Sequence, residues 1–462
     1  MGRDRLAPAH KTLYYWGVVN LFFALGQQFL NYILSPIGAN KFTYSSILVW
    51  LVVAVVSKRA TLRFPLFLVI MLVLAVWFNI TTLYAETQVA RFTIFTAMDT
   101  MLYVYALAFL QAAALVWFAP EVRRVYGRVM VVIVVLSSVV ALTQFLNFQP
   151  TIAYANMVRQ FDIVFTTGER EETIRSPGLF SNIGTAAVYG MIVSIMVTTA
   201  LEFRKMKWYE YTAVAFMMLS TLLVQVRTLL PFILICAVYL LVRFMRLYGA
   251  KGLGVVVLGI TAVLGFVAYK ADSFEYLFSS SNATMAYRKE VLWTQAYQIL
   301  DEYPLTGIGI EPAFAGWTTQ ILPNKWVETP LIDSGFWIAG CYGGWPAIGL
   351  IIMCLIAALL GAIRLLRAPD EDGWHRAFKL GVLWLVILFT VAMYWGSQWV
   401  NPAICTVYFV FAGLSLPSAR SEGIDPERQA KQTAALGERL WRALPGTMTE
   451  TGDVKAINKI YK

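Results

Sequence analysis

Apolar residues follow one another in long runs between Tyr14 and Leu416, and polar residues collect in the gaps between these runs. A helix needs about 20 apolar residues to cross about 30 Å of hydrocarbon, so runs of this length predict transmembrane helices. The pattern predicts an all-α fold, a polytopic transmembrane helical bundle of about 12 membrane helices. The predicted helices cover residues 14–34, 44–57, 64–80, 92–118, 129–147, 178–201, 208–225, 228–247, 252–270, 336–363, 379–396 and 399–416.

Two long connections divide the chain. Residues 1–270 are expected to contain the first nine helices, with a periplasmic loop at 148–177. Residues 271–335 form a second and longer periplasmic loop, and residues 336–416 form the last three helices. The polar segment 417–462 is expected to be a cytoplasmic tail. Long loops in a compact membrane protein are usually functional, so both periplasmic loops are candidate site regions.

The longer loop is expected to contain a helix that lies across the rim of the bundle. In "ATMAYRKEVLWTQAYQILDEYP", apolar residues recur on one helical face, with Asn282 or Thr284 as the N-cap and Pro304 beyond the end. "GIGIEP" and "CYGGWP" then predict turns. The apolar face of this rim helix consists of Leu292, Ala296, Ile299 and Leu300.

Composition and charge agree with a membrane protein. Apolar residues make up 59% of the chain and charged residues 14%, which excludes an ordinary soluble domain. Nineteen Lys and Arg residues fall in connections that a cytoplasmic N-terminus places inside, whereas the short external turns hold only Lys41, Arg91 and Arg227. Both termini are therefore predicted to be cytoplasmic. The net charge of +10 follows from this topology and calls for no nucleic-acid partner.

Arg227 is the only charged residue between Tyr211 and Val242, a run of 32 residues. As one straight helix this run would measure about 48 Å, which is too long for a single crossing. The run must therefore turn, and the stretch "TLLVQVRTLLPFILI" places Arg227 at the external tip of a hairpin. A turn residue that reaches water is the alternative role for Arg227.

Two further arginines fall on the same predicted side of the membrane. Arg175 precedes the sixth helix and Arg288 lies near the start of the rim helix. Guanidinium groups bind phosphate oxygens in pairs and stay charged at any working pH. Together with Arg227, these residues are candidates for binding a diphosphate.

Two acidic residues stand apart from the solvated acids of the loops. Asp333 leads directly into the tenth helix, where its carboxylate is a candidate base for an attacking hydroxyl, and an N-cap for that helix is the alternative role. Asp99 is the one acid predicted inside a membrane segment. Intramembrane acids are functional candidates, although structural pairing with an arginine explains Asp99 equally well.

Several kinds of site are not expected. The two histidines, His10 and His375, both fall in predicted cytoplasmic segments, so no external histidine base or zinc site is expected. Asp370 and Asp372 in "APDEDGWH" have the spacing of a metal-nucleotide motif, but they lie in a short basic cytoplasmic turn where catalysis is not expected. The four cysteines have neither metal-site nor disulfide spacing. No cofactor or metal is predicted.

Three blocks of sequence give the chain a family resemblance. They are "RSPGLFSNIGTAA", "VQVRTLL", and "YRKEVLWTQAYQILDEYPLTGIGIEPAF" followed by "DSGFWIAGCYGGWPAIGL". Across residues 170–355 the chain resembles the O-antigen ligase and Wzy-type polysaccharide polymerase family of bacterial inner-membrane glycosyltransferases. The family resemblance implies an inner-membrane location, a periplasmic active site, and metal-independent transfer of a glycan from undecaprenyl diphosphate.

The resemblance also implies roles for individual residues. Arg175, Arg227 and Arg288 would engage the lipid diphosphate, and Asp333, with Glu311 as the alternative, would orient or deprotonate the acceptor hydroxyl. Ligases of this kind carry a histidine where this chain has Asp333, which favours a polymerase. The implied donor and acceptor are undecaprenyl-diphosphate-linked oligosaccharides in the lipid bilayer, and the implied protein partners are a flippase and a chain-length regulator.

Three functions are weighed from these observations. The first is a polymerase that joins lipid-linked repeat units into an exopolysaccharide, capsule or O-antigen chain. The second is an O-antigen-type ligase that moves a finished glycan to another acceptor. The third is a flippase or transporter of the same lipid-linked glycan, which would require polar residues at mid-membrane depth on several helices.

Overall fold

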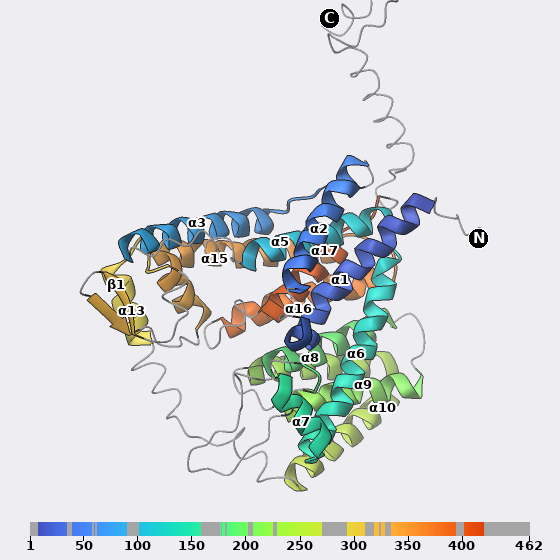
Figure 1. Cartoon of the computed structure of the whole chain (residues 1–462). Helices are drawn as coiled ribbons and strands as arrows, with labels where there is room; N and C mark the ends of the chain where they lie inside the picture. The colour runs from blue at the N-terminus through green and yellow to red at the C-terminus, as the bar shows by residue number, and fades with distance from the viewer. Residues whose placement is uncertain are drawn as a thin grey trace, which may run out of the picture.

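The computed structural model describes residues 8–34, 39–57, 60, 62–89, 101–158, 176, 178–180, 183–201, 207–224, 229–269, 293–309, 318–322, 325–328, 334–393 and 402–419. Within these ranges the structure is helical, apart from one short hairpin of strands (Figure 1). The predicted helical fold class is confirmed for this part of the chain.

Helices occur in all twelve predicted apolar segments, although one long helix covers two of them. The helices are α1 (Pro8–Leu34), α2 (Ala39–Val56), α3 (Leu66–Val89), α5 (Met101–Phe118), α6 (Val122–Phe145), α7 (Gln149–Val158), α8 (Ile183–Ala200), α9 (Trp208–Leu223), α10 (Leu230–Tyr269), α13 (Thr294–Glu302), α15 (Gly335–Arg367), α16 (Gly373–Ala392) and α17 (Pro402–Leu414). Strands β1 (Thr318–Leu322) and β2 (Lys325–Glu328) pair in antiparallel register.

The long helix α10 contains the predicted boundary between the eighth and ninth helices. The backbone at Gly249 is non-helical and separates two helical segments. Basic residues flank this break, which is where the sequence places a cytoplasmic connection.

Four helical segments in the described residues are long and apolar enough to cross a membrane: Leu66–Tyr84, Val122–Phe145, Gly335–Arg367 and Gly373–Val391. Shorter apolar helices cover Phe42–Val56, Leu102–Phe118, Gly184–Ala200 and Ile404–Leu414. Large aliphatic side chains face outward, such as Val132 at 57% and Leu136 at 54% exposure. Hydrocarbon, and not water, is the favourable solvent for such a surface. The chain is therefore a membrane protein, while the full count of twelve crossings stays a prediction.

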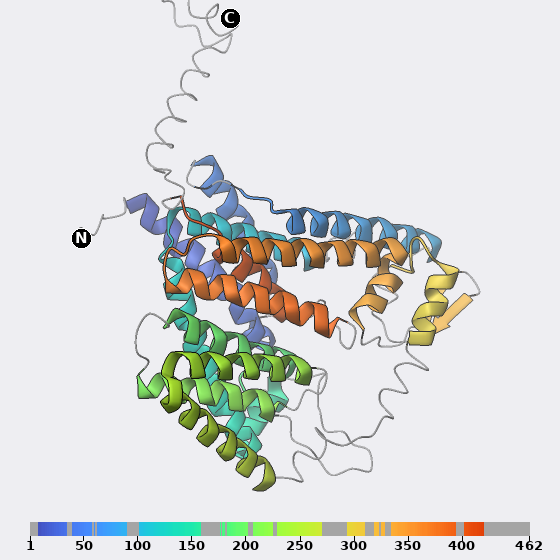
Figure 2. The ribbon, with the colours of Figure 1, turned by 180° about the vertical axis from the view of Figure 1, so that it is seen from behind.

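The bundle is held together by three close helix pairs, α3 with α15, α5 with α17, and α8 with α16. Figures 1 and 2 show α3 and α15 side by side along much of their length. Aromatic rings fill the space between elements that are far apart in sequence: Phe67 lies edge-on to Phe109 (5.6 Å between centroids), and Tyr105 stacks on Phe409 (5.7 Å). These contacts belong to one continuous apolar core, which includes residues of both the first and the last helices.

One end of the bundle is closed by a buried ion pair and its hydrogen bonds. Arg123, near the start of α6, is fully buried, and its guanidinium donates to Glu371 Oε2 (2.8 Å) and to the carbonyl oxygens of Leu414 (2.7 Å) and Leu416. Glu371 also accepts from the backbone N–H of Ser418 (2.7 Å). We call this the inner end. Figure 1 shows α13 and the strand hairpin at the opposite, outer end.

The acidic residues of "APDEDGWH" have structural roles at the inner end. Asp370 pairs with Lys379 (2.6 Å) and lies 3.8 Å from the guanidinium of Arg376. Asp372 is the N-cap of α16 and accepts from the backbone N–H of His375 (2.6 Å). These contacts account for the spacing of the two aspartates without a nucleotide.

Candidate functional site

The predicted site residues lie outside the residues that the structure describes. The structure does describe residues next to several of them in sequence, so it shows which chain segments meet around the site. The residues outside the described ranges are Asp333, Glu311, Arg175, Arg227, Arg288 and Asp99.

The segments that carry Arg175 and Arg227 are joined by a hydrogen bond. Ser176, which follows Arg175, donates its backbone N–H to the carbonyl oxygen of Leu223 (3.1 Å), the last residue of α9. Leu223 comes four residues before Arg227. Ser176 and Leu223 are both fully buried. Segments 47 residues apart in sequence therefore meet next to two of the three predicted arginines.

Polar side chains of α6 hold the segment that follows Arg175. The amide of Gln144 makes two hydrogen bonds with Gly178: its Nε2 donates to the carbonyl oxygen (3.0 Å), and its Oε1 accepts from the N–H (2.9 Å). Ser137 Oγ accepts from the N–H of Leu179 (2.9 Å). The motif "RSPGLF" is thus fixed to α6 by three hydrogen bonds from side chains. These side chains pair with backbone N–H and C=O groups that have no partner in a helix or strand, and so they fix the loop in place.

Helix α7 adds a further hydrogen bond to the same segment. This helix lies within the predicted loop 148–177, for which the sequence analysis named no helix. The hydroxyl of Tyr154 donates to the carbonyl oxygen of Leu179 (3.1 Å). Burial raises the pKa of the Tyr154 phenol, so the hydroxyl stays protonated and keeps donating at neutral pH.

The segment that carries Asp333 lies against the last turn of α16. Ser334 is buried, and its Oγ donates to the carbonyl oxygen of Met393 (3.3 Å), which also accepts from Gly335 N–H (2.8 Å). The N-cap of α15 is Ser334, whose extended backbone leads into the helix. The structure therefore gives Ser334, and not Asp333, as the N-cap of this helix, while Asp333 itself lies outside the described residues.

The predicted rim helix is present as α13. It ends at Glu302, two residues before Pro304, as predicted. The predicted N-cap residues Asn282 and Thr284 lie outside the described residues. The predicted apolar face is confirmed where it is described, because the buried residues of this helix are Ala296, Ile299 and Leu300.

The turn after α13 docks on α15 through its backbone. Ile308 donates its N–H to the carbonyl oxygen of Cys341 (2.7 Å). Gly307 has a φ of 59°, and a β-carbon at this position would lie 2.3 Å from the same oxygen. Only glycine allows both this conformation and this contact. The glycine of "PLTGIG" therefore joins the rim segment to the bundle.

The predicted turn "CYGGWP" is a bend inside α15, and Figure 2 shows the first segment of this helix turned away from the second. Gly344 has a φ of 69°, and the next residue, Trp345, donates its N–H to the carbonyl oxygen of Pro304 (2.8 Å). Trp77 of α3 donates its indole N–H to the carbonyl oxygen of Gly343 (2.7 Å). The bend leaves the carbonyl oxygen of Gly343 and the N–H of Trp345 without partners inside the helix. Trp77 of α3 and Pro304 of the rim turn supply these partners.

Contacts along α8 and α16 place these segments at one end of the bundle. A β-carbon added to Gly373, at the start of α16, would lie 2.6 Å from the carbonyl oxygen of Ala200, at the end of α8. The two helices therefore run in opposite directions, and Met393 lies toward the start of α8. The segments before Arg227, after Arg175 and after Asp333 gather at the outer end.

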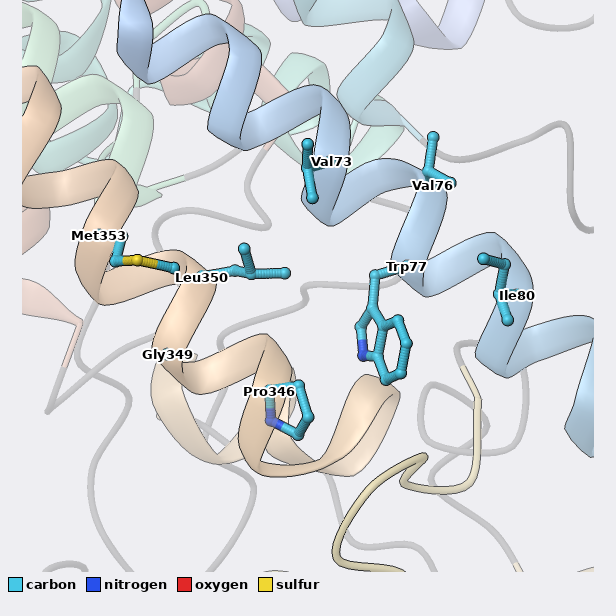
Figure 3. Close-up of a pocket in the computed structure, with 8 residues that line it drawn as sticks. All are labelled: Val73, Val76, Trp77, Ile80, Pro346, Gly349, Leu350 and Met353. Carbon is cyan, nitrogen blue, oxygen red and sulfur yellow. The ribbon is translucent and has the colours of Figure 1, made fainter.

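An apolar groove runs between α3 and α15 and reaches the outer end at the bend of α15. Its volume is about 580 Å³. Figure 3 shows Trp77 and Leu350 projecting into the space between the two helices, with Pro346 beside the bend. The lining residues are Val73, Val76, Trp77, Ile80, Pro346, Gly349, Leu350 and Met353.

Sequence reasoning missed the side chains that position the outer-end segments. Gln144 and Tyr154 hold the segment after Arg175, and Trp77 holds the bend of α15. The sequence signal for Gln144 is that it is an amide near the end of an apolar run. A buried amide in a membrane helix needs a partner, so this residue type at this position predicts a helix-to-loop hydrogen bond.

Comparison with known proteins gives no match to a family model and no match to a curated protein. The functional interpretation rests on the residues themselves and on the segments that the fold brings together.

Proposed function

We propose that the protein is a metal-independent membrane glycosyltransferase of the polymerase type. It transfers a glycan from undecaprenyl diphosphate to a lipid-linked repeat unit at the periplasmic face of a bacterial inner membrane. One observation carries the proposal: the hydrogen bond between Ser176 and Leu223 joins the segments that contain Arg175 and Arg227. Guanidinium groups on two adjacent segments are suited to the two phosphates of one diphosphate.

The proposed reaction is a displacement at the anomeric carbon. The acceptor hydroxyl attacks this carbon, the bond to the diphosphate oxygen breaks, and the bonding electrons leave with the diphosphate. Arg175, Arg227 and Arg288 stabilise the charge that develops there. Asp333, with Glu311 as the alternative, takes the hydroxyl proton. Attack from the face opposite the leaving group inverts the anomeric configuration.

The groove between α3 and α15 supports a lipid-linked donor. An isoprenoid chain needs an apolar surface that adjoins the diphosphate site, and the groove is apolar along its length. Its Trp77 end adjoins the bend where α15 contacts the rim turn. We place the hydrocarbon chain of the donor in this groove.

The buried hydroxyls of α8 argue against a transport pathway through this helix. Ser194, Thr198 and Thr199 are buried, and each donates to a carbonyl oxygen of its own helix one turn earlier. Hydroxyls bonded in this way are satisfied without a substrate. A ligase remains the second candidate, and Asp333 in place of the histidine of ligases favours the polymerase.

Deletion of the gene followed by analysis of lipid-linked glycans tests the reaction. Loss of a polymerase leaves single repeat units on the lipid carrier. Intact polymer on the carrier would instead indicate a ligase, and unchanged surface polymer would contradict both enzymes. A wild-type copy on a plasmid should restore the polymer, which controls for effects on neighbouring genes.

A further inference from the structure

His375, in the first turn of α16, is buried at the inner end of the bundle, where it takes no part in the proposed transfer reaction. Both nitrogens of its ring make hydrogen bonds to backbone groups. The N–H of Glu371 donates to Nδ1 (3.1 Å), and Nε2 lies 2.9 Å from the carbonyl oxygen of Ser415. The ring therefore joins the connection before α16 to the segment that follows α17.

These two contacts fix the protonation state of the ring. A backbone N–H can only donate, so Nδ1 must accept and carries no proton. A carbonyl oxygen can only accept, so Nε2 must carry the proton and donate it to Ser415. The neutral ring satisfies both contacts, whereas the imidazolium has a donor on each nitrogen. A proton on Nδ1 would therefore set two donors against each other and break the hydrogen bond from Glu371.

The charged groups around the ring also oppose a proton there. Arg123 of α6, Glu371 of the connection and Lys379 of α16 face the ring. Asp372, the N-cap of α16, accepts the backbone N–H of His375 (2.6 Å). Because Glu371 is already paired with Arg123 (2.8 Å), a proton on the ring would add a further positive charge beside a buried guanidinium.

We propose that His375 is a pH-sensitive contact that holds the inner end of the bundle together. The neutral ring joins the segment after α17 to the connection before α16. Uptake of a proton from the cytoplasmic side, where the predicted topology places this end, breaks the hydrogen bond from Glu371 and separates the two segments. Acidification therefore weakens the same assembly of helices that the Arg123 ion pair closes.

The contribution of this contact to stability has a defined pH window. A histidine in the unfolded chain binds a proton near about pH 6.5, and Asp and Glu carboxyls bind theirs only near about pH 4. Because the folded chain resists the proton, the contact contributes fully above about pH 6.5 and is lost as the pH falls below this value. Each pH unit of this loss should lower the ratio of folded to unfolded protein by up to about tenfold.

The test is the unfolding equilibrium of the full chain in mixed detergent micelles at about pH 7.5 and about pH 5.5, which lie on either side of the histidine titration and above that of the carboxyls. The ratio of folded to unfolded wild-type protein should fall by up to about tenfold between these two conditions. The variant His375→Asn keeps an acceptor for the N–H of Glu371 but cannot titrate. We expect it to lose most of the pH dependence, whatever its stability at the higher pH.

The second histidine of the chain, His10, provides the matched control. The variant His10→Asn removes the same titratable group elsewhere and should keep the pH dependence of the wild type. Equal pH dependence in the wild type and His375→Asn, or its loss in His10→Asn, would overturn the proposal. Should His375→Asn not fold, His375→Gln, which keeps a donor for Ser415, makes the same comparison. A wild-type protein whose unfolding does not change between the two conditions overturns the proposal without any variant.

Discussion

Arginine and lysine carry the same charge, but only arginine presents a planar fork of donors that fits two phosphate oxygens at once. This difference allows a test of Arg227 that keeps the charge of the external turn. A turn residue that only reaches water tolerates lysine, whereas a diphosphate ligand does not. The choice between the two roles of Arg227 therefore depends on geometry and not on charge.

We expect Arg227→Lys to lower glycan transfer at least about tenfold, because one paired hydrogen bond to phosphate is lost. Polymer formation in a deletion strain that carries the variant on a plasmid measures the effect. Arg128→Lys, at an exposed position on α6, is the control and should behave like the wild type. Full activity of Arg227→Lys at equal membrane levels would remove Arg227 from the site.

Gln144 provides a second test at the scale of one residue. Gln144→Ala removes both hydrogen bonds to Gly178 and leaves buried backbone groups unpaired, which should cost about 1–3 kcal/mol of folding stability. It should also lower transfer, because the segment after Arg175 loses its support. Thr143→Ala is the matched control, since among the described residues that hydroxyl bonds only to Val140 of its own helix. Equal unfolding temperatures for the two variants would contradict this role.

Arg227 and Gln144 differ in how much of their role the sequence alone predicts. Arg227 stands out because a charge within an apolar run is expected at a helix end. Helix α9 ends at Leu223, before Arg227, and α10 begins at Leu230, after it. The sequence does not identify Gly178 as the partner of Gln144, because Gly178 comes 34 positions later. Local patterns predict the cost of burying a polar group but not the identity of its partner.

At the scale of elements, the sequence predicted helix positions well and helix shape poorly. The break of α10 at Gly249 was predicted because basic residues interrupt two apolar runs. The bend of α15 was predicted only as a turn, because "CYGGWP" lies between apolar residues on both sides. Its shape depends on Pro304 and Trp77, which come from other elements. Helix α7 is short and lies in a segment with no apolar run, so no pattern indicated it.

The groove between α3 and α15 gives a prediction at the same scale. Gly349 lines the groove, and among the described residues no atom beyond its chain neighbours and its own helix backbone lies within 4 Å of a β-carbon added there. Gly349→Trp should fill the groove and lower transfer from the lipid-linked donor several-fold, with little change in stability. Gly361→Trp is the matched control, because Gly361 has the same open surroundings on α15 and does not line the groove.

Activity of purified protein on lipid-linked oligosaccharide, together with the unfolding temperature, separates blocked binding from misfolding. If both tryptophan variants transfer glycan at the wild-type rate, the hydrocarbon chain of the donor lies elsewhere on the bundle.

At the scale of the whole molecule, the hydrogen bonds of Arg123 at the inner end join helices that are far apart in sequence. Arg123→Leu leaves the Glu371 carboxylate without its guanidinium partner and removes the donors to Leu414 and Leu416. Removing one member of a buried pair costs about 3–5 kcal/mol, so the unfolding temperature in detergent should fall clearly. Arg124→Leu, at the exposed next position, should change stability by less than about 0.5 kcal/mol. Similar unfolding temperatures for both variants would show that the buried pair contributes little.

Topology is also a property of the whole chain. A cysteine at Val226 should react with an impermeant thiol reagent from the periplasmic side, and a cysteine at Lys251 should not, because the connections alternate across the membrane. Cys236, Cys341 and Cys405 are buried and Cys354 is partly buried, so the protein without added cysteines serves as the background control. The reverse labelling pattern would place Arg227 in the cytoplasm and exclude the proposed periplasmic site.

The ion pair of Arg123 also bears on how the chain is assembled. Glu371 is made 248 residues after Arg123, which at about 5–20 residues per second is a delay of roughly 12–50 seconds during synthesis. Throughout that interval α6 can enter the bilayer only with its guanidinium kept at the water interface. A ribosome that stalls before Glu371 therefore releases a chain in which the Arg123 guanidinium has no carboxylate partner.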